Sequence, residues 1–248
     1  MVIWLYCYIL PFDKIMKTLY KKELNYYLNN PIGYIVVILF AVFANFLFVK
    51  DIFVVGSASM RPFFHFLPWL FLIFIPALTM RIISEEKRTN TIETLLTLPL
   101  SETEIVLAKF FSLLTLTSIG LLLTIGLPLS LSFLTKLYLP EVIVGYVGSI
   151  LLAGLYISLS MFFSGLTKNQ VIAFLGSVLV LFFLLVLGTD FTAGILPKGI
   201  HDTLIYFSPF NHLSSFVKGV FDLRSIFYFI SFTVMFLFLT VIDLEKRF

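Results

Sequence analysis

Charge is scarce in this sequence, and so are the residue types on which most soluble enzymes rely. Of its 248 residues, 60% are hydrophobic and only 12% are charged, against about 25% charged in ordinary soluble domains. This composition is that of a polytopic membrane protein, so the length sets the number of membrane spans. The single cysteine, Cys7, excludes a disulfide framework within the chain and a thiolate metal site.

The signatures of soluble catalysis are missing as well. The pattern G-x-x-x-x-G-K-[ST] does not occur, so the chain does not bind ATP through a P-loop. Neither G-x-S-x-G nor H-E-x-x-H is present. The three histidines, His65, His201 and His212, are too dispersed to predict a metal site. We therefore expect no catalytic residue, metal or cofactor on this chain.

Six apolar runs are long enough to cross a bilayer, which requires about 20 residues each. Backbone groups in lipid must bond to one another, so the runs are predicted to be helices in an all-α polytopic membrane protein. The third run is longer than needed and contains Pro128, so it is predicted to tilt, to kink or to project from the bilayer. The runs cover residues 32–49, 64–83, 105–133, 142–164, 171–187 and 226–243.

Ionisable residues are absent from the interior of these runs. Charges inside a membrane are costly, and those that remain usually belong to proton or ion pathways. Their absence disfavours an ion-coupled carrier. It indicates that the energy source lies on another protein.

Residues 14–30 show the pattern of an amphipathic helix at the membrane interface. The alternative is a merely solvated leader. The apolar face holds Met16, Tyr20, Leu24 and Tyr27, and the polar face holds Lys17, Lys21, Lys22 and Asn25. Met16 begins a more ordinary N-terminal sequence than Met1 does. We therefore interpret residues 1–15 as a leader that is disordered or that results from a misassigned start codon. Residues 31–248 form the predicted transmembrane domain.

The distribution of lysine and arginine predicts the orientation. With the N-terminus in the cytoplasm, 11 of the 17 basic residues lie on the cytoplasmic side, as the positive-inside rule requires. Both termini are then cytoplasmic. The outer segment 188–225 is apolar despite its length, and Ser208-Pro209 divides it into two short helical pieces. It is predicted to cap the bundle or to dip into the outer leaflet.

One charge-dense segment, residues 81–104, separates the second and third runs. Asn90 with Glu93, and Ser101 with Glu104, match the capping-box spacing at the starts of two helices. The first of these, residues 91–98, is stopped by Pro99. It places Ile92, Leu95 and Leu96 on one face. The membrane surface, the N-terminal helix or another protein must cover that face; an ordinary interfacial loop is the alternative.

The run MRIISEEKRTNTIETLLTLPLSETEIVLAKF resembles the loop after the second span of ABC-2 type transporter permeases. Those families share two glutamates, then T-x-E-x-L-L-x-x-P-[LIV]-S, then I-V-x-x-K-[FY]. The gliding-motility-associated (GldF-type) permeases are nearest in appearance. Their opening is similar to KKELNYYLNNPIGYIV, and the segment before their last span is similar to YFSPFNHLSSFVKGVFDLRSIFYF.

This resemblance implies six spans, an N-terminal interface helix, a cytoplasmic coupling helix between spans 2 and 3, and two short outer helices before span 6. It also implies export across the bacterial inner membrane by two permease subunits, alike or different, with two cytoplasmic ATP-binding cassette subunits that bind ATP and magnesium. By matching positions, the docking element would be Thr91, Ile92, Glu93, Leu95 and Leu96. The hinge with the second span would be Glu85 and Glu86.

Three points stay open at the level of sequence: the residue at position 90, the function and the substrate. Asn90 stands where relatives usually have glycine, which bears on the flexibility of the hinge. The alternative function is a non-transport membrane scaffold in an envelope or motility machine. The apolar spans are compatible with a lipid, a lipid-linked polymer or a peptide as substrate. We expect membrane lipid around the chain and no nucleic-acid partner.

Overall fold

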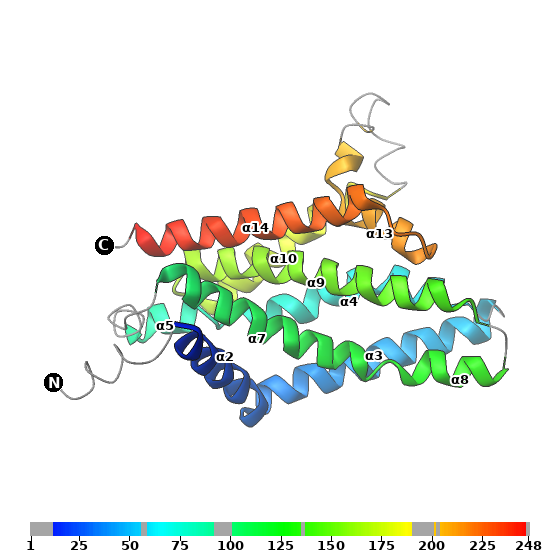
Figure 1. The fold of residues 1–248 in the computed structure, drawn as a ribbon, viewed down its shortest axis with the longest axis horizontal. Coiled ribbons are helices and arrows are strands. Elements are labelled where there is room, and N and C mark those ends of the chain that lie inside the picture. The colour runs from blue at the N-terminus through cyan, green and yellow to red at the C-terminus, as the bar shows by residue number, and fades with distance from the viewer. Residues whose placement is uncertain are drawn as a thin grey trace.

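Long apolar helices run side by side along the long axis of the molecule (Figure 1). The computed structural model describes residues 12–55, 59–91, 101–134, 137–189, 201 and 204–246. No β-strand occurs in these ranges, so the predicted all-helical class is confirmed for them. The long helices are α3 (Pro31–Val55), α4 (Arg61–Thr79), α7 (Glu102–Leu122), α9 (Leu139–Leu166), α10 (Gln170–Val186) and α14 (Leu223–Glu245).

Five stretches of the described chain are long and apolar enough to cross a membrane. The helix α10, with 17 residues, is apolar but shorter. Six spans therefore stay a prediction. The five stretches are 33–50, 61–88, 102–133, 139–166 and 223–245.

The helix α9 forms the centre of the bundle. It packs against α4, α7, α10, α13 (Pro209–Val217) and α14, and residues such as Leu152, Tyr156 and Leu159 are fully buried. Small residues allow this close packing. A Cβ atom at Gly145 would lie 2.4 Å from Cε2 of Phe64, so only glycine fits against that ring.

The third apolar run is two helices, α7 and α8 (Gly126–Leu134), joined by a turn at residues 123–125. Pro128 has no N–H to donate to the carbonyl of Thr124, so a continuous helix would lose a hydrogen bond here. The hydroxyl of Thr124 bonds to the carbonyl of Leu121 at 2.7 Å and to the hydroxyl of Tyr146 at 2.9 Å. The predicted kink is confirmed at this turn.

The second apolar run, in contrast, is not one helix to residue 83. The helix α4 ends at Thr79, a turn covers residues 80–83, and α5 (Ser84–Arg88) follows. The hydroxyl of Ser164 in α9 accepts hydrogen bonds from the amides of Ile83 and Ser84 at 3.2 and 3.1 Å. It donates to the carbonyl of Met80 at 3.0 Å. A side chain from a distant helix thus satisfies the backbone groups that the turn leaves unpaired.

The helix α2 (Phe12–Asn29) crosses one end of the bundle at an angle to the long helices (Figure 1). It begins two residues before the predicted start, and residues 1–11 lie outside the described part. Its buried face carries Leu19, Glu23 and Tyr27, with Met16 and Tyr20 packed at one side. The lysines at 17, 21 and 22 are exposed. The predicted polar and apolar faces are therefore present, but a buried glutamate lies on the apolar one.

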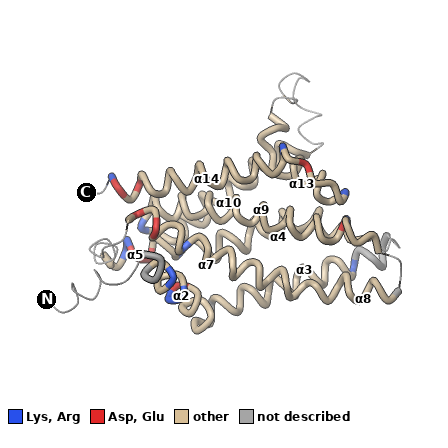
Figure 2. Tube along the Cα trace, in the orientation of Figure 1, with Lys and Arg blue, Asp and Glu red and all other residues tan. Residues whose placement is uncertain are grey.

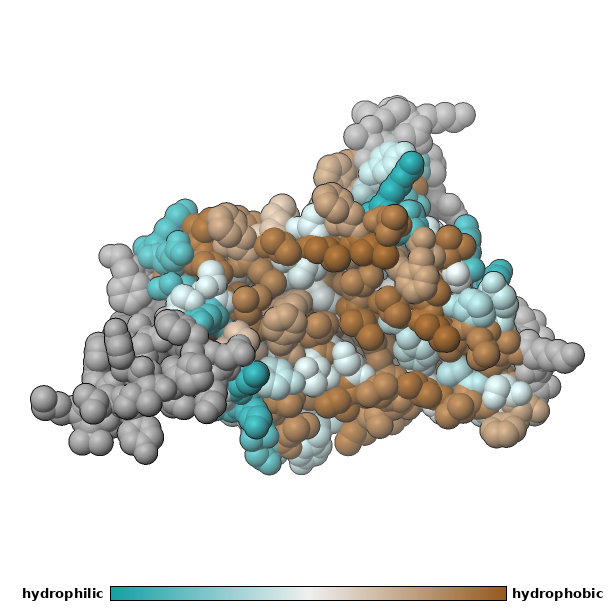
Figure 3. Space-filling model, viewed as in Figure 1, coloured by the Kyte–Doolittle hydropathy of each residue, from teal (hydrophilic) through white to brown (hydrophobic). Residues whose placement is uncertain are grey.

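Charged residues gather where α2, α5 and the C-terminal end of α14 meet, with fewer at the opposite end (Figure 2). Between the two ends, the face in Figure 3 is covered mainly by apolar side chains. The described chain begins and ends at the charged end (Figure 1). This arrangement suits a molecule whose middle lies in lipid.

At the opposite end, a short 3₁₀ helix (Ile205–Phe207) precedes α13. Ser208 caps α13 by accepting from the amide of Phe210 at 3.3 Å, and Pro209 occupies the first helical position. The division at Ser208-Pro209 is therefore as predicted. Phe216 packs against Gly148 of α9, so α13 caps the bundle. Residues 190–200 and 202–203, where the other outer helix is predicted, lie outside the described part.

Candidate functional site

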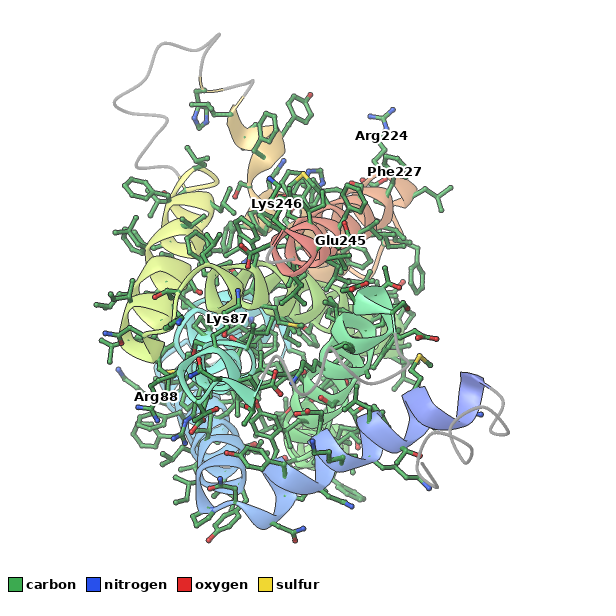
Figure 4. The ribbon with its side chains drawn as sticks, turned by 90° about the vertical axis from the view of Figure 1, so that its left-hand side faces the viewer. Lys87, Arg88, Arg224, Phe227, Glu245 and Lys246 are labelled. Atoms are coloured by element: carbon green, nitrogen blue, oxygen red, sulfur yellow. The ribbon has the colours of Figure 1, made fainter. Side chains whose placement is uncertain are left out.

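The charged end places α5 between two groups of helices. The carboxylate of Glu86 pairs with Lys109 of α7, which in turn pairs with Glu23 of α2, whereas the ammonium of Lys87 contacts α9 and α14. Figure 4 looks onto this end, with Lys87 inside the bundle and Arg88 at its rim. Residues 81–91, called the α5 segment below, thus connect parts of the molecule that are distant in sequence.

The first ionic contact is the Lys109 cluster, formed by Lys109, Glu23 and Glu86. Nζ of Lys109 lies 3.1 Å from Oε1 of Glu23 in α2 and 2.6 Å from Oε1 of Glu86 in α5. It also donates to the carbonyl of Ile82 at 3.1 Å. An ammonium has three donors, and all three are used. Lys109 is 1% exposed, so this cluster is buried.

The second contact is the Lys87 cluster, formed by Lys87, Asp243 and the carbonyl of Gly165. Nζ of Lys87 lies 2.6 Å from Oδ2 of Asp243 in α14 and donates to the carbonyl oxygen of Gly165 in α9. Lys87 is 2% exposed. A cation this deeply buried needs such partners, because removing it from water is expensive.

The two clusters lie on different sides of α5. Consecutive residues of a helix point about 100° apart, so Glu86 and Lys87 reach different neighbours. Glu85, the other predicted hinge residue, pairs within the α5 segment, with Arg81 at 3.2 Å and with Arg88 at 3.8 Å. Partly exposed pairs of this kind contribute about 0.5 kcal/mol or less. Of the two glutamates, Glu86 makes the structural connection.

The helix α5 ends in a left-handed turn. The amide of Thr89 donates to the carbonyl of Glu85 at 2.9 Å, and Asn90 follows with a φ of 56°. Asn90 is the only non-glycine residue with positive φ in the described part of the chain. Glycine adopts this conformation most easily and asparagine is among the next best. Asparagine is therefore well suited to this position.

The predicted docking element lies mostly beyond the described residues. Thr91 is described: its hydroxyl is 2.9 Å from that of Thr89. Ile92, Glu93, Leu95 and Leu96 fall within residues 92–100, outside the described part, as does the capping box predicted for Asn90 with Glu93. The second capping box is confirmed, since Ser101 accepts from the amide of Glu104 at 3.4 Å and Glu104 accepts from that of Ser101 at 2.9 Å.

A cleft of about 230 Å³ lies between α2 and the α5 segment, lined in part by Lys22, Tyr26 and Arg81. At its base the hydroxyl of Tyr27 donates to the carbonyl of Leu78 at 3.1 Å. Burial, and then the nearby carboxylate of Glu23, raise the pKa of the Tyr27 hydroxyl. The hydroxyl therefore keeps its proton and ties α2 to the end of α4.

The acidic residues of this end do not form a metal site. Within the described ranges, no group of three or more His, Cys, Asp or Glu side chains could hold a metal ion. Glu23, Glu86 and Asp243 face lysine ammonium groups instead. The arrangement can transmit displacement between helices, because its ion pairs join residues of different helices.

Sequence reasoning missed the role of the two lysines of these clusters and two of their partners. Lys109 entered as the lysine of the I-V-x-x-K-[FY] motif and Lys87 as a basic residue of the charge-dense segment, both without a partner, and neither Glu23 nor Asp243 was singled out. The spacing of charges along the chain carried one usable signal: Glu23 stands on the otherwise apolar face of α2. A charge on the buried face of an amphipathic helix usually has a partner.

The fold and the charged end define a multi-pass helical membrane protein. The family model of the ABC-2 family transporter protein matches residues 17–243, nearly the whole chain, so the chain belongs to this family. It is a membrane component of an ABC-2 transporter, and such components lack ATPase activity and generally pair with ATP-binding subunits. No curated protein matches the chain.

Proposed function

We propose that this chain is the permease subunit of an ATP-driven exporter, in which residues 81–104 receive the movement of a separate ATP-binding subunit. The observation that carries the proposal is the position of α5. Its buried contacts reach α2, α7, α9 and α14 at one end of the bundle. A displacement of this segment would therefore move the ends of several membrane helices at once.

In the proposed assembly, two ATP-binding cassette subunits carry ATP and magnesium, and this chain pairs with a second permease, identical or different. Thr91, Ile92, Glu93, Leu95 and Leu96 would dock on the ATP-binding subunit, with Glu85 and Glu86 at the hinge. The gap between two conformations of such a bundle is a few kcal/mol, which differential binding of a partner can cover.

The orientation belongs to the same proposal. Both termini and the α5 segment would lie in the cytoplasm of a bacterium, with the chain in the inner membrane. The charge distribution in Figure 2 supports this orientation, because the end that carries α2 and α5 holds most of the described basic residues. The gliding-motility permeases that the sequence resembles suggest an export system of that type, with a lipid, lipid-linked polymer or peptide as substrate.

The test uses the chain co-purified with the ATP-binding subunit and reconstituted in lipid nanodiscs. Leu95→Asp and Glu93→Arg should each weaken association with that subunit at least about tenfold, because a buried apolar or paired group is replaced by an unpaired charge. The rate of ATP hydrolysis should also stop responding to the permease. Both variants should insert normally.

Glu245→Arg is the matched control. It makes the same charge change as Glu93→Arg, at an exposed residue of α14 at the same end of the molecule. This variant should leave association with the ATP-binding subunit unchanged. Normal association and an unchanged ATPase response in both docking variants would contradict the proposal. Failure of any P-loop ATPase to respond to the wild-type chain would favour the scaffold function.

A further inference from the structure

The two buried lysines connect α5 to different helices. Lys109 joins Glu86 to α7 and, through Glu23, to α2. Lys87 belongs to α5 itself and joins it to Asp243 of α14 and to the backbone of α9. No residue is shared between the two clusters.

We infer that Lys87 and Lys109 are positioning residues that fix α5 to two different pairs of helices: Lys109 to α7 and α2, and Lys87 to α9 and α14. The inference rests on the proposed function, because it assigns the route by which movement of the coupling segment reaches the membrane helices. Each contact can be broken while the other remains.

Burial makes these contacts stiff. Both ammonium groups are almost completely shielded from water, and they donate to carboxylate and carbonyl oxygens of other elements. A buried ammonium cannot separate from such partners without leaving charges unpaired in a poorly solvated place. The helices that contribute the partners must therefore follow α5, or the contact must be exchanged as a whole.

Neighbouring charges do not replace these contacts. Glu85 pairs with Arg81 and with Arg88, and all three side chains are more exposed than the two lysines. Salt and water screen such partly exposed pairs. Both pairs join residues of the α5 segment to one another, so they do not connect it to α7 or α14.

The experiment measures distances between spin labels on the chain in complex with the ATP-binding subunit in nanodiscs. Cys7→Ser removes the native cysteine, and cysteines are then introduced at exposed Arg88 with Lys21 of α2, or at Arg88 with Glu245 of α14. Lys87→Met should make the Arg88–Glu245 distance distribution about twofold broader, because the released helix ends fluctuate. The Arg88–Lys21 distribution should stay narrow. Lys109→Met should do the reverse.

Two further variants separate positioning from stability. In Lys87→Asp with Asp243→Lys, the ion pair is restored with its charges exchanged, and the narrow Arg88–Glu245 distribution should return. The second is a neutral triple variant that combines Glu23→Gln, Glu86→Gln and Lys109→Met. Because it leaves no charge of the Lys109 cluster unpaired, the chain should fold, while the Arg88–Lys21 distance distribution should stay broad. Selective broadening and its rescue are results that general loss of stability would not give.

The inference would be overturned if each single variant broadened both distance distributions equally, or if neither variant broadened any. A narrow Arg88–Lys21 distribution in the neutral triple variant would also overturn it. The Arg88–Glu245 and Arg88–Lys21 distances are also measured in samples of the complex without nucleotide. A wild-type chain that fails to alter the ATPase rate would overturn the proposed function, whereas the selective broadening would still decide whether the lysines hold α5 in this way.

Discussion

Lys109 shows what a single residue contributes to this molecule. Removing one partner from a buried ion pair costs about 3–5 kcal/mol, whereas replacing the whole set with apolar groups is often neutral. The Lys109 cluster therefore adds little net stability over an apolar contact. Its consequence is geometric: one ammonium fixes a carboxylate of α2, a carboxylate of α5 and the end of the α4 turn in one place.

Asn90 provides a test at the residue scale. Its φ of 56° lies in the left-handed region, which costs an ordinary residue about 1–2 kcal/mol. Asn90→Ala should therefore lower the free energy of unfolding by about 1 kcal/mol, and Asn90→Gly should leave it unchanged or raise it slightly. Thermal unfolding of the purified protein, followed by intrinsic fluorescence, measures both.

The control for Asn90 is Arg88→Ala, which changes an exposed residue inside α5. It should shift the unfolding temperature less than Asn90→Ala does. If alanine were tolerated at position 90 as well as glycine, the left-handed turn would not be the reason for the residue found there.

At the scale of elements, α9 determines how closely its neighbours approach. Gly145 contacts Phe64 of α4, and Gly148 contacts Phe216 of α13. Two glycines three residues apart, and so adjacent on the surface of α9, thus each contact an aromatic ring. Gly148 thereby holds α13 over the end of the bundle.

Gly148→Ala should destabilise the protein by about 1–3 kcal/mol, because overpacking a filled contact has this cost. The added Cβ would lie 2.6 Å from Cβ of Phe216. Gly154→Ala is the matched control on the same helix: its nearest neighbour, Cζ of Phe110, would be 3.7 Å away, an ordinary contact. Unfolding temperatures of the two variants in the same detergent give the comparison, and equal stability of the two variants would contradict the assigned packing.

At the scale of the whole molecule, the two ends differ in charge and in shape. One end carries α2, α5 and the end of α14 with most of the described basic residues, and the other carries α13 over the end of α9 (Figures 1 and 2). Lysine and arginine are retained on the cytoplasmic side of membrane proteins. This difference predicts which end faces the cytoplasm.

Reporter fusions test that orientation. Green fluorescent protein fused after Lys246 should fluoresce, since it folds in the cytoplasm, and alkaline phosphatase fused at Gly219 should be active, since it requires the oxidising outer side. Gly219 lies in the turn after α13, at the opposite end from Lys246. Exchanging the two reporters should abolish both signals. Activity of the phosphatase at position 246 would reverse the proposed orientation.

The sequence alone determined the membrane class, the helical state of the apolar runs, the kink near Pro128, the Ser101 capping box and the start of α13 at Pro209. These features depend on local chemistry: chain composition, a missing N–H, or a side chain within three residues of the amide that it caps. The family resemblance likewise rests on contiguous motifs.

Only the tertiary structure decided where the second apolar run breaks and which charges meet. The turn at residues 80–83 is held by Ser164, about 80 positions away in the chain, and Lys109 meets Glu23 across a separation of 86. Lys87 and Asp243 are separated by 156. No local pattern encodes such pairs, because they arise when the apolar faces of α9 and its neighbours pack and bring the polar ends of those helices together.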